Sequence, residues 1–188
     1  MVATILAAFV DDPAWAYLTG GDFDRVSPHF ARALFDSRVG LGSVWVTDDR
    51  LATALWELRE ARDPDGAGDP EVDRVWTDYR EAVGEDVFDL MRAYDDALHE
   101  HEPPRPYWYL GVLATHPTAQ GRGWARAVLA PVLAIADRDG FDCWLETSKL
   151  TNLGFYDHIG FAERIEVDVP DGPTTWWLRR RPASPSAD

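Results

Sequence analysis

Residues 117–125 read PTAQGRGWA and separate two segments of different periodicity. Before them, the apolar run YWYLGVLAT at 107–115 predicts a strand, and after them residues 121–138 have the apolar spacing of a helix. The first turn of a helix carries unpaired backbone N–H groups and a partial positive charge, which favour a bound phosphate. Gly121 and Gly123 have no side chain, so a ligand can approach the backbone closely.

Several interpretations of this loop compete. A dinucleotide site would use Gly121 and Gly123, with Glu146 near the offset expected for a ribose contact, but Arg126 stands where the third glycine belongs. The P-loop pattern Gly-x-x-x-x-Gly-Lys-Ser/Thr does not occur in the sequence. The pattern Gln-x-x-Gly-x-Ala at 120–125 resembles the pyrophosphate loop of the GNAT N-acetyltransferases. A glycine-rich helix start that binds no ligand is the remaining alternative.

A second motif follows at residues 145–161, which read LETSKLTNLGFYDHIGF. It resembles the closing segment of a GNAT domain, in which an Asn precedes a Tyr by four residues and Gly-Phe begins the next strand. Asn152, Tyr156 and Gly160-Phe161 occupy these places. Four residues are one helical turn, so Asn152 and Tyr156 should share a face of the helix. Two motifs in this order identify the chain as similar to the GNAT superfamily.

Further short matches are similar to puromycin N-acetyltransferase and its actinobacterial relatives. Those relatives begin with an additional strand, whereas this chain opens on a predicted helix. The strand is therefore missing, shortened to residues 1–4, or lost to a misplaced start. Trp124 stands where a small or aliphatic residue is common, and residues 60–105 match weakly. The matching segments are AAFVD at 7–11, RVGL at 38–41, VWVTDD at 44–49, WYL at 108–110, QGRG at 120–123, LETS at 145–148, NLGFY at 152–156 and TWW at 175–177.

Hydrophobic periodicity and turn residues predict one α/β (α+β) domain over residues 1–181, with a flexible tail at 182–188. The resemblance implies a GNAT fold, with a mixed central sheet of about six strands flanked by helices and a missing or shortened first strand. Residues from about 70 to 101 are predicted to form a helical insertion on the substrate side. The predicted helices are 3–10, 13–18, one opened by Ser27-Pro28, 70–83, 87–98, 121–138 and 151–159, and the strands are 43–48, 51–58, 107–115, 142–147, 161–169 and 174–180.

The resemblance also implies direct acetyl transfer from acetyl-CoA to an amine, without a covalent acyl-enzyme. Tyr156 is then the candidate general acid that protonates the departing thiolate, and Glu146 is the candidate base for the attacking amine. A packed tyrosine and an ordinary paired carboxylate are the structural alternatives. The implied cofactor-binding residues are Leu113, Ala114, Thr115, Gln120, Gly121, Arg122, Gly123, Trp124, Ala125, Asn152 and Tyr156, with Arg126 as further help for the pyrophosphate.

The amino-acid composition limits the classes of ligand and partner that the chain is expected to bind. The 188 residues carry a formal charge of −15, which disfavours nucleic acid and favours a cationic small molecule. A single cysteine, Cys143, excludes an internal disulfide and fits a reducing, cytoplasmic location. No apolar run is long enough to span a membrane. His99 and His101 lack the spacing of a zinc site, so no metal is expected. The chain has nine tryptophans. Most of them are expected to pack in the core, and the others are expected to line a binding site for a flat ligand.

These observations predict an acetyl-CoA-dependent N-acetyltransferase that acts on the amine of a small molecule, such as a nucleoside antibiotic or another aromatic amine. Two alternatives stay open. One is an N-acetyltransferase of proteins or peptides, and the other is a sensor that binds acetyl-CoA without turnover. The sequence does not decide between a monomer and a homodimer.

Overall fold

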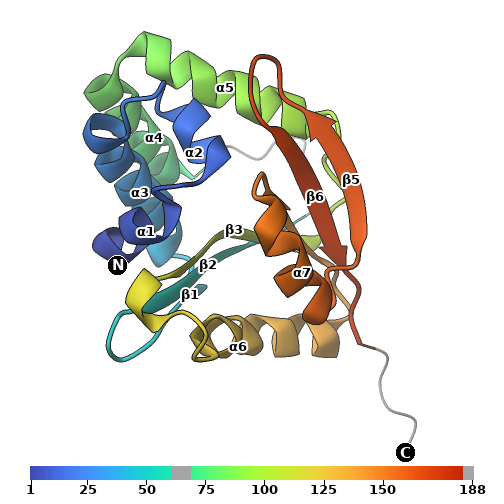
Figure 1. Ribbon diagram of the computed structural model, residues 1–188. Coiled ribbons are helices and arrows are strands. Elements are labelled where there is room, and N and C mark those ends of the chain that lie inside the picture. The colour runs from blue at the N-terminus through green and yellow to red at the C-terminus, as the bar shows by residue number, and fades with distance from the viewer. Residues whose placement is uncertain (61–68, 184–188) are drawn as a thin grey trace, which may run out of the picture.

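The computed structural model describes residues 1–60 and 69–183, and its centre is one six-stranded sheet (Figure 1). The spatial order of the strands is β1-β2-β3-β4-β6-β5, and β3 and β4 are parallel while the other neighbours are antiparallel. This is the mixed sheet expected of the predicted fold class. The strands are β1 (Val44–Val46), β2 (Ala52–Arg59), β3 (Tyr107–Thr115), β4 (Cys143–Thr147), β5 (Glu163–Asp168) and β6 (Thr174–Arg180).

Helices cover both faces of the sheet, and each face has its own apolar core (Figure 1). One core includes Trp15, Phe30 and Tyr94, and the other includes Leu129 and Tyr156. The first face carries α1 (Val2–Phe9), α2 (Pro13–Leu18), α3 (Phe23–Val39), α4 (Pro70–Val83) and α5 (Glu85–His99), and the second carries α6 (Trp124–Asp139) and α7 (Leu150–His158).

The structure corrects one expectation about the first forty residues and removes one of the alternatives for the first strand. Helix α3 begins at Phe23 with Asp22 as its N-cap, so Pro28 lies inside the helix and does not open it. The loss of one backbone hydrogen bond at Pro28 is offset by burial of the apolar face that includes Val26 and Phe30. Residues 1–4 do not form a shortened strand, because α1 already begins at Val2.

Gly111 forms a β-bulge that changes which side chains of β3 face which core. Leu55 on β2 lies opposite Val112 and Trp56 lies opposite Leu110, so Gly111 has no counterpart. Tyr109 faces the α1–α5 side, and after the bulge Val112 and Ala114 face that side as well. An unbroken alternation would have placed them on the opposite face.

Strands β3 and β4 separate after a short parallel pairing. Their register consists of Trp108–Cys143 and Tyr109–Trp144, although β3 continues to Thr115 and β4 to Thr147. The sheet therefore opens between the carboxyl ends of two parallel strands. Ligands of α/β proteins often bind at such an opening, because backbone polar groups there are not used by a neighbouring strand.

Candidate active site

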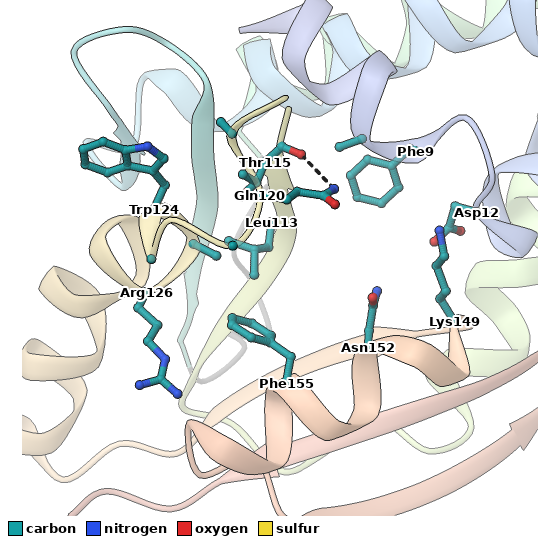
Figure 2. Close-up of a pocket in the computed structure, with 15 residues that line it drawn as sticks. Phe9, Asp12, Leu113, Thr115, Gln120, Trp124, Arg126, Lys149, Asn152 and Phe155 are labelled. Carbon is teal, nitrogen blue, oxygen red and sulfur yellow. Dashed lines mark hydrogen bonds between the residues drawn. The ribbon is translucent and has the colours of Figure 1, made fainter. Parts of the chain in front are cut away.

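The first cavity lies between the glycine-rich loop, the end of β3 and the start of α7, and it has a volume of about 390 Å³ (Figure 2). Leu113 and Thr115 approach it from β3, while Asn152 and Phe155 approach it from α7. The cavity is therefore formed where the sheet opens. The loop contributes Gln120, Gly121, Gly123, Trp124, Ala125 and Arg126.

The loop has the geometry that its glycines allow. Gly121 and Gly123 have φ values of 75° and 83°, in the left-handed region where L side chains are strained. A Cβ atom at either position would meet no atom of the described residues within 4 Å, so the space beside this backbone is open. Gly123 is the N-cap of α6, which makes the helix begin at Trp124 and not at the predicted residue 121. The first N–H groups of α6 are thus available to an anion at the cavity wall.

Most of the predicted cofactor-binding residues line this cavity, but three do not. Ala114 is fully buried in the core on the α1–α5 side, because the bulge at Gly111 turns its side chain away. Arg122 is exposed and lies outside the lining. Tyr156 lines a second cavity instead. The predicted residues in the lining are Leu113, Thr115, Gln120, Gly121, Gly123, Trp124, Ala125 and Asn152.

Other residues of the lining were missed by the sequence analysis. Phe9 and Asp12 reach the cavity from the end of α1 and the loop before α2, more than 100 residues away in the chain. Lys149 and Phe155 belong to the start and the middle of the α7 segment. Phe155 could have been found, because it lies three residues after Asn152 and so on the same helical face. Nothing in the sequence indicated that Phe9 and Asp12 face the loop.

The second cavity, of about 570 Å³, adjoins the first. Its walls come from α2, α3, α4 and α5 on one side and from β2, β3 and β4 on the other. Side chains of the 70–101 helices, including Trp76, Met91 and Tyr94, are part of the wall. Four residues line both cavities and mark their junction: Phe9, Asp12, Leu113 and Asn152.

Glu146, the candidate base, lies at the end of β4 and lines the second cavity. The Tyr109 hydroxyl donates a hydrogen bond of 2.6 Å to its Oε1 atom, while Oε2 is buried without a partner among the described residues. Burial raises the pKa of Glu146 to about 7, and the Tyr109 hydrogen bond and the Arg59 charge lower it in part. A carboxyl group with this pKa exchanges its proton near neutral pH.

Tyr156, the candidate acid, lies in the same cavity as Glu146. Its ring packs edge-on against Phe155 and Phe161, which fixes its position on α7. Burial, followed by the nearby Glu146 charge, raises the pKa of Tyr156 well above its ordinary value, so the hydroxyl keeps its proton at neutral pH. Asn152 and Tyr156 both line the second cavity, as their one-turn spacing predicts.

Acidic side chains outnumber basic ones in the lining of the second cavity. Arg38 lies 3.4 Å from Glu57, and Arg59 lies 3.5 Å from Glu102 and packs its guanidinium 3.9 Å from the centre of the Tyr109 ring. Both arginines are thus paired with carboxylates inside the protein, and Glu102 pairs with Arg105 as well. Asp95 lines the cavity and has no ion pair with another described residue. The other acidic residues of the lining are Asp12, Asp69, Asp73 and Glu146.

Three other titratable side chains, Cys143, His116 and His99, are not part of either cavity lining. Cys143 is fully buried, and burial raises the pKa of its thiol to about 12. His116 accepts a hydrogen bond from the backbone N–H of Thr118 and so caps a short helical turn. His99 lies 3.3 Å from Glu102 at the end of α5. Within residues 1–60 and 69–183, no His, Cys, Asp and Glu side chains are grouped to hold a metal ion. The helices in these ranges are also too short or too polar to cross a membrane.

An open six-stranded sheet with a glycine-rich helix start beside the opening is the architecture of the GNAT class of acetyltransferases. The sequence model of the Acetyltransferase (GNAT) family matches residues 53–161, which is more than half of the chain. The chain therefore belongs to this family, whose members use acetyl-CoA.

Individual relatives agree with this assignment. An uncharacterized N-acetyltransferase of Schizosaccharomyces pombe is 27% identical over 189 residues, covering 88% of this chain and 70% of the relative. A structure from Corynebacterium glutamicum, described as histone acetyltransferase HPA2 and related acetyltransferase, is 20% identical with a TM-score of 0.58, covering 99% of this chain and 91% of the other. Arylalkylamine N-acetyltransferase 2 from Aedes aegypti is 12% identical with a TM-score of 0.57, covering 95% and 91%. The two solved structures share the fold.

Proposed function

We propose that this chain transfers the acetyl group of acetyl-CoA to the amine of a cationic small molecule with an aromatic or flat apolar part. The observation that carries the proposal is the junction of the two cavities at Phe9, Asp12, Leu113 and Asn152. A thioester that extends from the first cavity would meet an amine held in the second. Holding both reactants in this way replaces a bimolecular encounter and can supply several kcal/mol of the barrier.

The loop and helix start of the first cavity suit the pyrophosphate of CoA. The backbone at residues 120–125 offers open space and N–H groups, and Arg126 adds a positive charge to the lining. Asn152 has an amide group to bind the polar pantetheine arm. The end of β3, where Leu113 and Thr115 line the cavity, is no longer paired with β4 and can offer backbone groups to the same arm.

The walls of the second cavity support an aromatic acceptor. Trp15, Phe30 and Trp76 lie among its lining residues, and α4 and α5 close one side of it. Large rings offer apolar area and quadrupolar faces to a flat or cationic ligand. The similarity of the sequence motifs to puromycin N-acetyltransferase supports a nucleoside-type acceptor within this class.

The charges of the cavity support a cationic acceptor. Arg38 and Arg59 each pair with a carboxylate, and the lining also includes the acidic residues Asp12, Asp69, Asp73, Asp95 and Glu146, so acidic side chains outnumber basic ones. A protonated amine is attracted into such a cavity, and the formal charge of −15 adds a long-range attraction.

The proposed reaction uses two side chains of the second cavity. Glu146 removes a proton from the ammonium group of the acceptor, and the neutral nitrogen attacks the thioester carbonyl. A C–N bond forms, the C–S bond breaks, and Tyr156 donates its proton to the departing CoA thiolate. The attacking nitrogen loses its second proton as the amide forms, and this proton restores Tyr156. The proton held by Glu146 passes to solvent, which restores the carboxylate.

The test is a thiol-release assay with acetyl-CoA and a panel of acceptors: puromycin, tryptamine, a neutral aromatic alcohol of similar size, and a peptide with a free N-terminus. We expect CoA to be released with one or both aromatic amines, at least tenfold faster than with the alcohol or peptide. Faster turnover of the peptide would favour the peptide acetyltransferase. Binding of acetyl-CoA without thiol release for any amine would favour the sensor and overturn the proposal.

A further inference from the structure

Lys149 is the only lysine of the chain, and it lines the first cavity. It is the N-cap residue of α7 and lies two residues after the end of β4, the strand that carries Glu146. Figure 2 shows its side chain extending from the start of α7 toward Asp12, on the side of Asn152 away from the glycine-rich loop. The amine thus points toward Asp12 and not toward the phosphate loop.

Asp12 belongs to the four residues at which the two cavities meet. If acetyl-CoA binds as proposed above, its thioester must lie at this junction, because only there can the acetyl group reach an acceptor. The Lys149 amine and the reactive carbonyl are therefore directed to the same part of the molecule.

The position of Asp12 is fixed by its surroundings. Its Oδ1 atom accepts hydrogen bonds from the backbone N–H groups of Ala14 and Trp15 and from the Ser148 hydroxyl. Ser148 also accepts a hydrogen bond of 2.9 Å from the N–H of Ala14. This network ties the start of α2 to the residue before Lys149, so the carboxylate and the lysine backbone are held relative to each other.

We propose that Lys149 is a self-acetylation site, modified by the acetyl-CoA bound in its own cavity when no acceptor amine occupies the junction. The inference rests on the proposed function. The neutral Nζ atom attacks the thioester carbonyl, a C–N bond forms, and the C–S bond breaks to release CoA, whose thiolate takes up one proton. The Lys149 ammonium first gives a proton to Asp12.

Two features support this chemistry. Burial raises the pKa of Asp12, despite its backbone hydrogen bonds, so the carboxylate is a better proton acceptor than an exposed aspartate. Lysine acetylation removes a positive charge, and Lys149 is the only side-chain amine of the chain that can undergo it. A single reactive side chain makes the modification unambiguous to detect.

The experiment is intact-mass analysis of the purified chain incubated with acetyl-CoA, followed by peptide mapping to separate Lys149 from the N-terminal amine. We expect one acetyl group on Lys149, a rate that saturates with acetyl-CoA, and a rate constant that does not depend on protein concentration. Lys149→Arg should lose the adduct. Gly121→Asp, which places a carboxylate in the proposed phosphate loop, should lose it as well, and so should the wild type with excess CoA.

Three results would overturn the inference. They are no adduct at Lys149, an adduct that forms equally fast in Gly121→Asp, and a rate that is linear in acetyl-CoA and unchanged when the chain is unfolded in urea. A calorimetric titration with CoA is run in parallel. Binding of CoA without acetylation of Lys149 refutes only the self-acetylation, whereas the absence of CoA binding refutes the proposed function itself.

Discussion

Glu146 determines the pH dependence that the proposed mechanism predicts. The carboxyl group must be ionised to accept a proton, and burial raises its pKa to about 7. We therefore expect kcat/KM to rise with pH and to level off above about pH 7. Glu146→Gln should lower kcat by about 10²-fold or more and remove this limb of the profile. A profile of kcat/KM measured at amine concentrations well below KM over pH 5–9 tests this, and a limb that persists in the variant would assign the base to another group.

The general-acid role of Tyr156 is tested by a substitution that removes only its hydroxyl group. Tyr156→Phe keeps the ring that packs against Phe155 and Phe161, so we expect CoA binding to be retained and turnover to fall by about 10²-fold, because the thiolate loses its proton donor. Tyr79→Phe is the matched control, since its buried hydroxyl has no partner among the described residues and lies outside the second cavity. Equal losses of turnover in both variants would contradict an acid role for Tyr156.

At the scale of secondary-structure elements, glycine substitutions at the two ends of α6 distinguish an effect on ligand binding from an effect on stability alone. Gly121 and Gly140 both have positive φ, 75° and 76°, and a Cβ atom at either would meet nothing within 4 Å in the part of the chain that the structure describes. Gly121→Ala and Gly140→Ala should each cost about 1 kcal/mol of unfolding free energy. Only Gly121→Ala should also weaken CoA binding, because it alone alters the loop. Calorimetry and urea unfolding of both variants test this, and equal CoA affinities would remove the loop from the binding site.

The glycine at the bulge in β3 leaves room for the side chain of Arg38. A Cβ atom at Gly111 would lie 2.9 Å from Nη2 of Arg38, whose side chain is buried beside the second cavity. We expect Gly111→Ala to displace the guanidinium group, lower stability by about 1–3 kcal/mol and raise KM for the amine, with little change in CoA affinity. Adding Arg38→Ala removes the clash. A double-mutant cycle in which the two losses of stability simply add would show that the residues do not interact.

The order and type of most elements were predictable from local patterns, and the exceptions have physical causes. The Gln120–Ala125 loop and the Asn152–Tyr156 spacing depend on neighbours in the chain, so the sequence contains their signal. Pro28 misled the prediction of α3, because packing of the helix against the core outweighs one lost hydrogen bond. The direction of Ala114 depends on a bulge that no alternation of apolar residues indicates.

At the scale of the whole molecule, the site is built from segments that are distant in sequence. Asp12 and Lys149 lie together only because the loop before α2 packs against the strand end at Ser148. The second cavity likewise needs α4 and α5 to fold back over α2 and α3 (Figure 1). Such contacts have no local sequence signature. The junction of the two cavities and the aromatic wall of the second cavity therefore could not be predicted from the sequence.

The central claim is that the opening between β3 and β4 binds acetyl-CoA, and a thermal-shift titration tests it most directly. A ligand at a hundredfold excess over its Kd stabilises the native state by about 2.7 kcal/mol. For a chain of this size we expect a rise in Tm of about 5–10 °C with CoA and acetyl-CoA, and none with NAD or ATP at the same concentrations. No shift with either CoA compound, or an equal shift with NAD, would contradict the account.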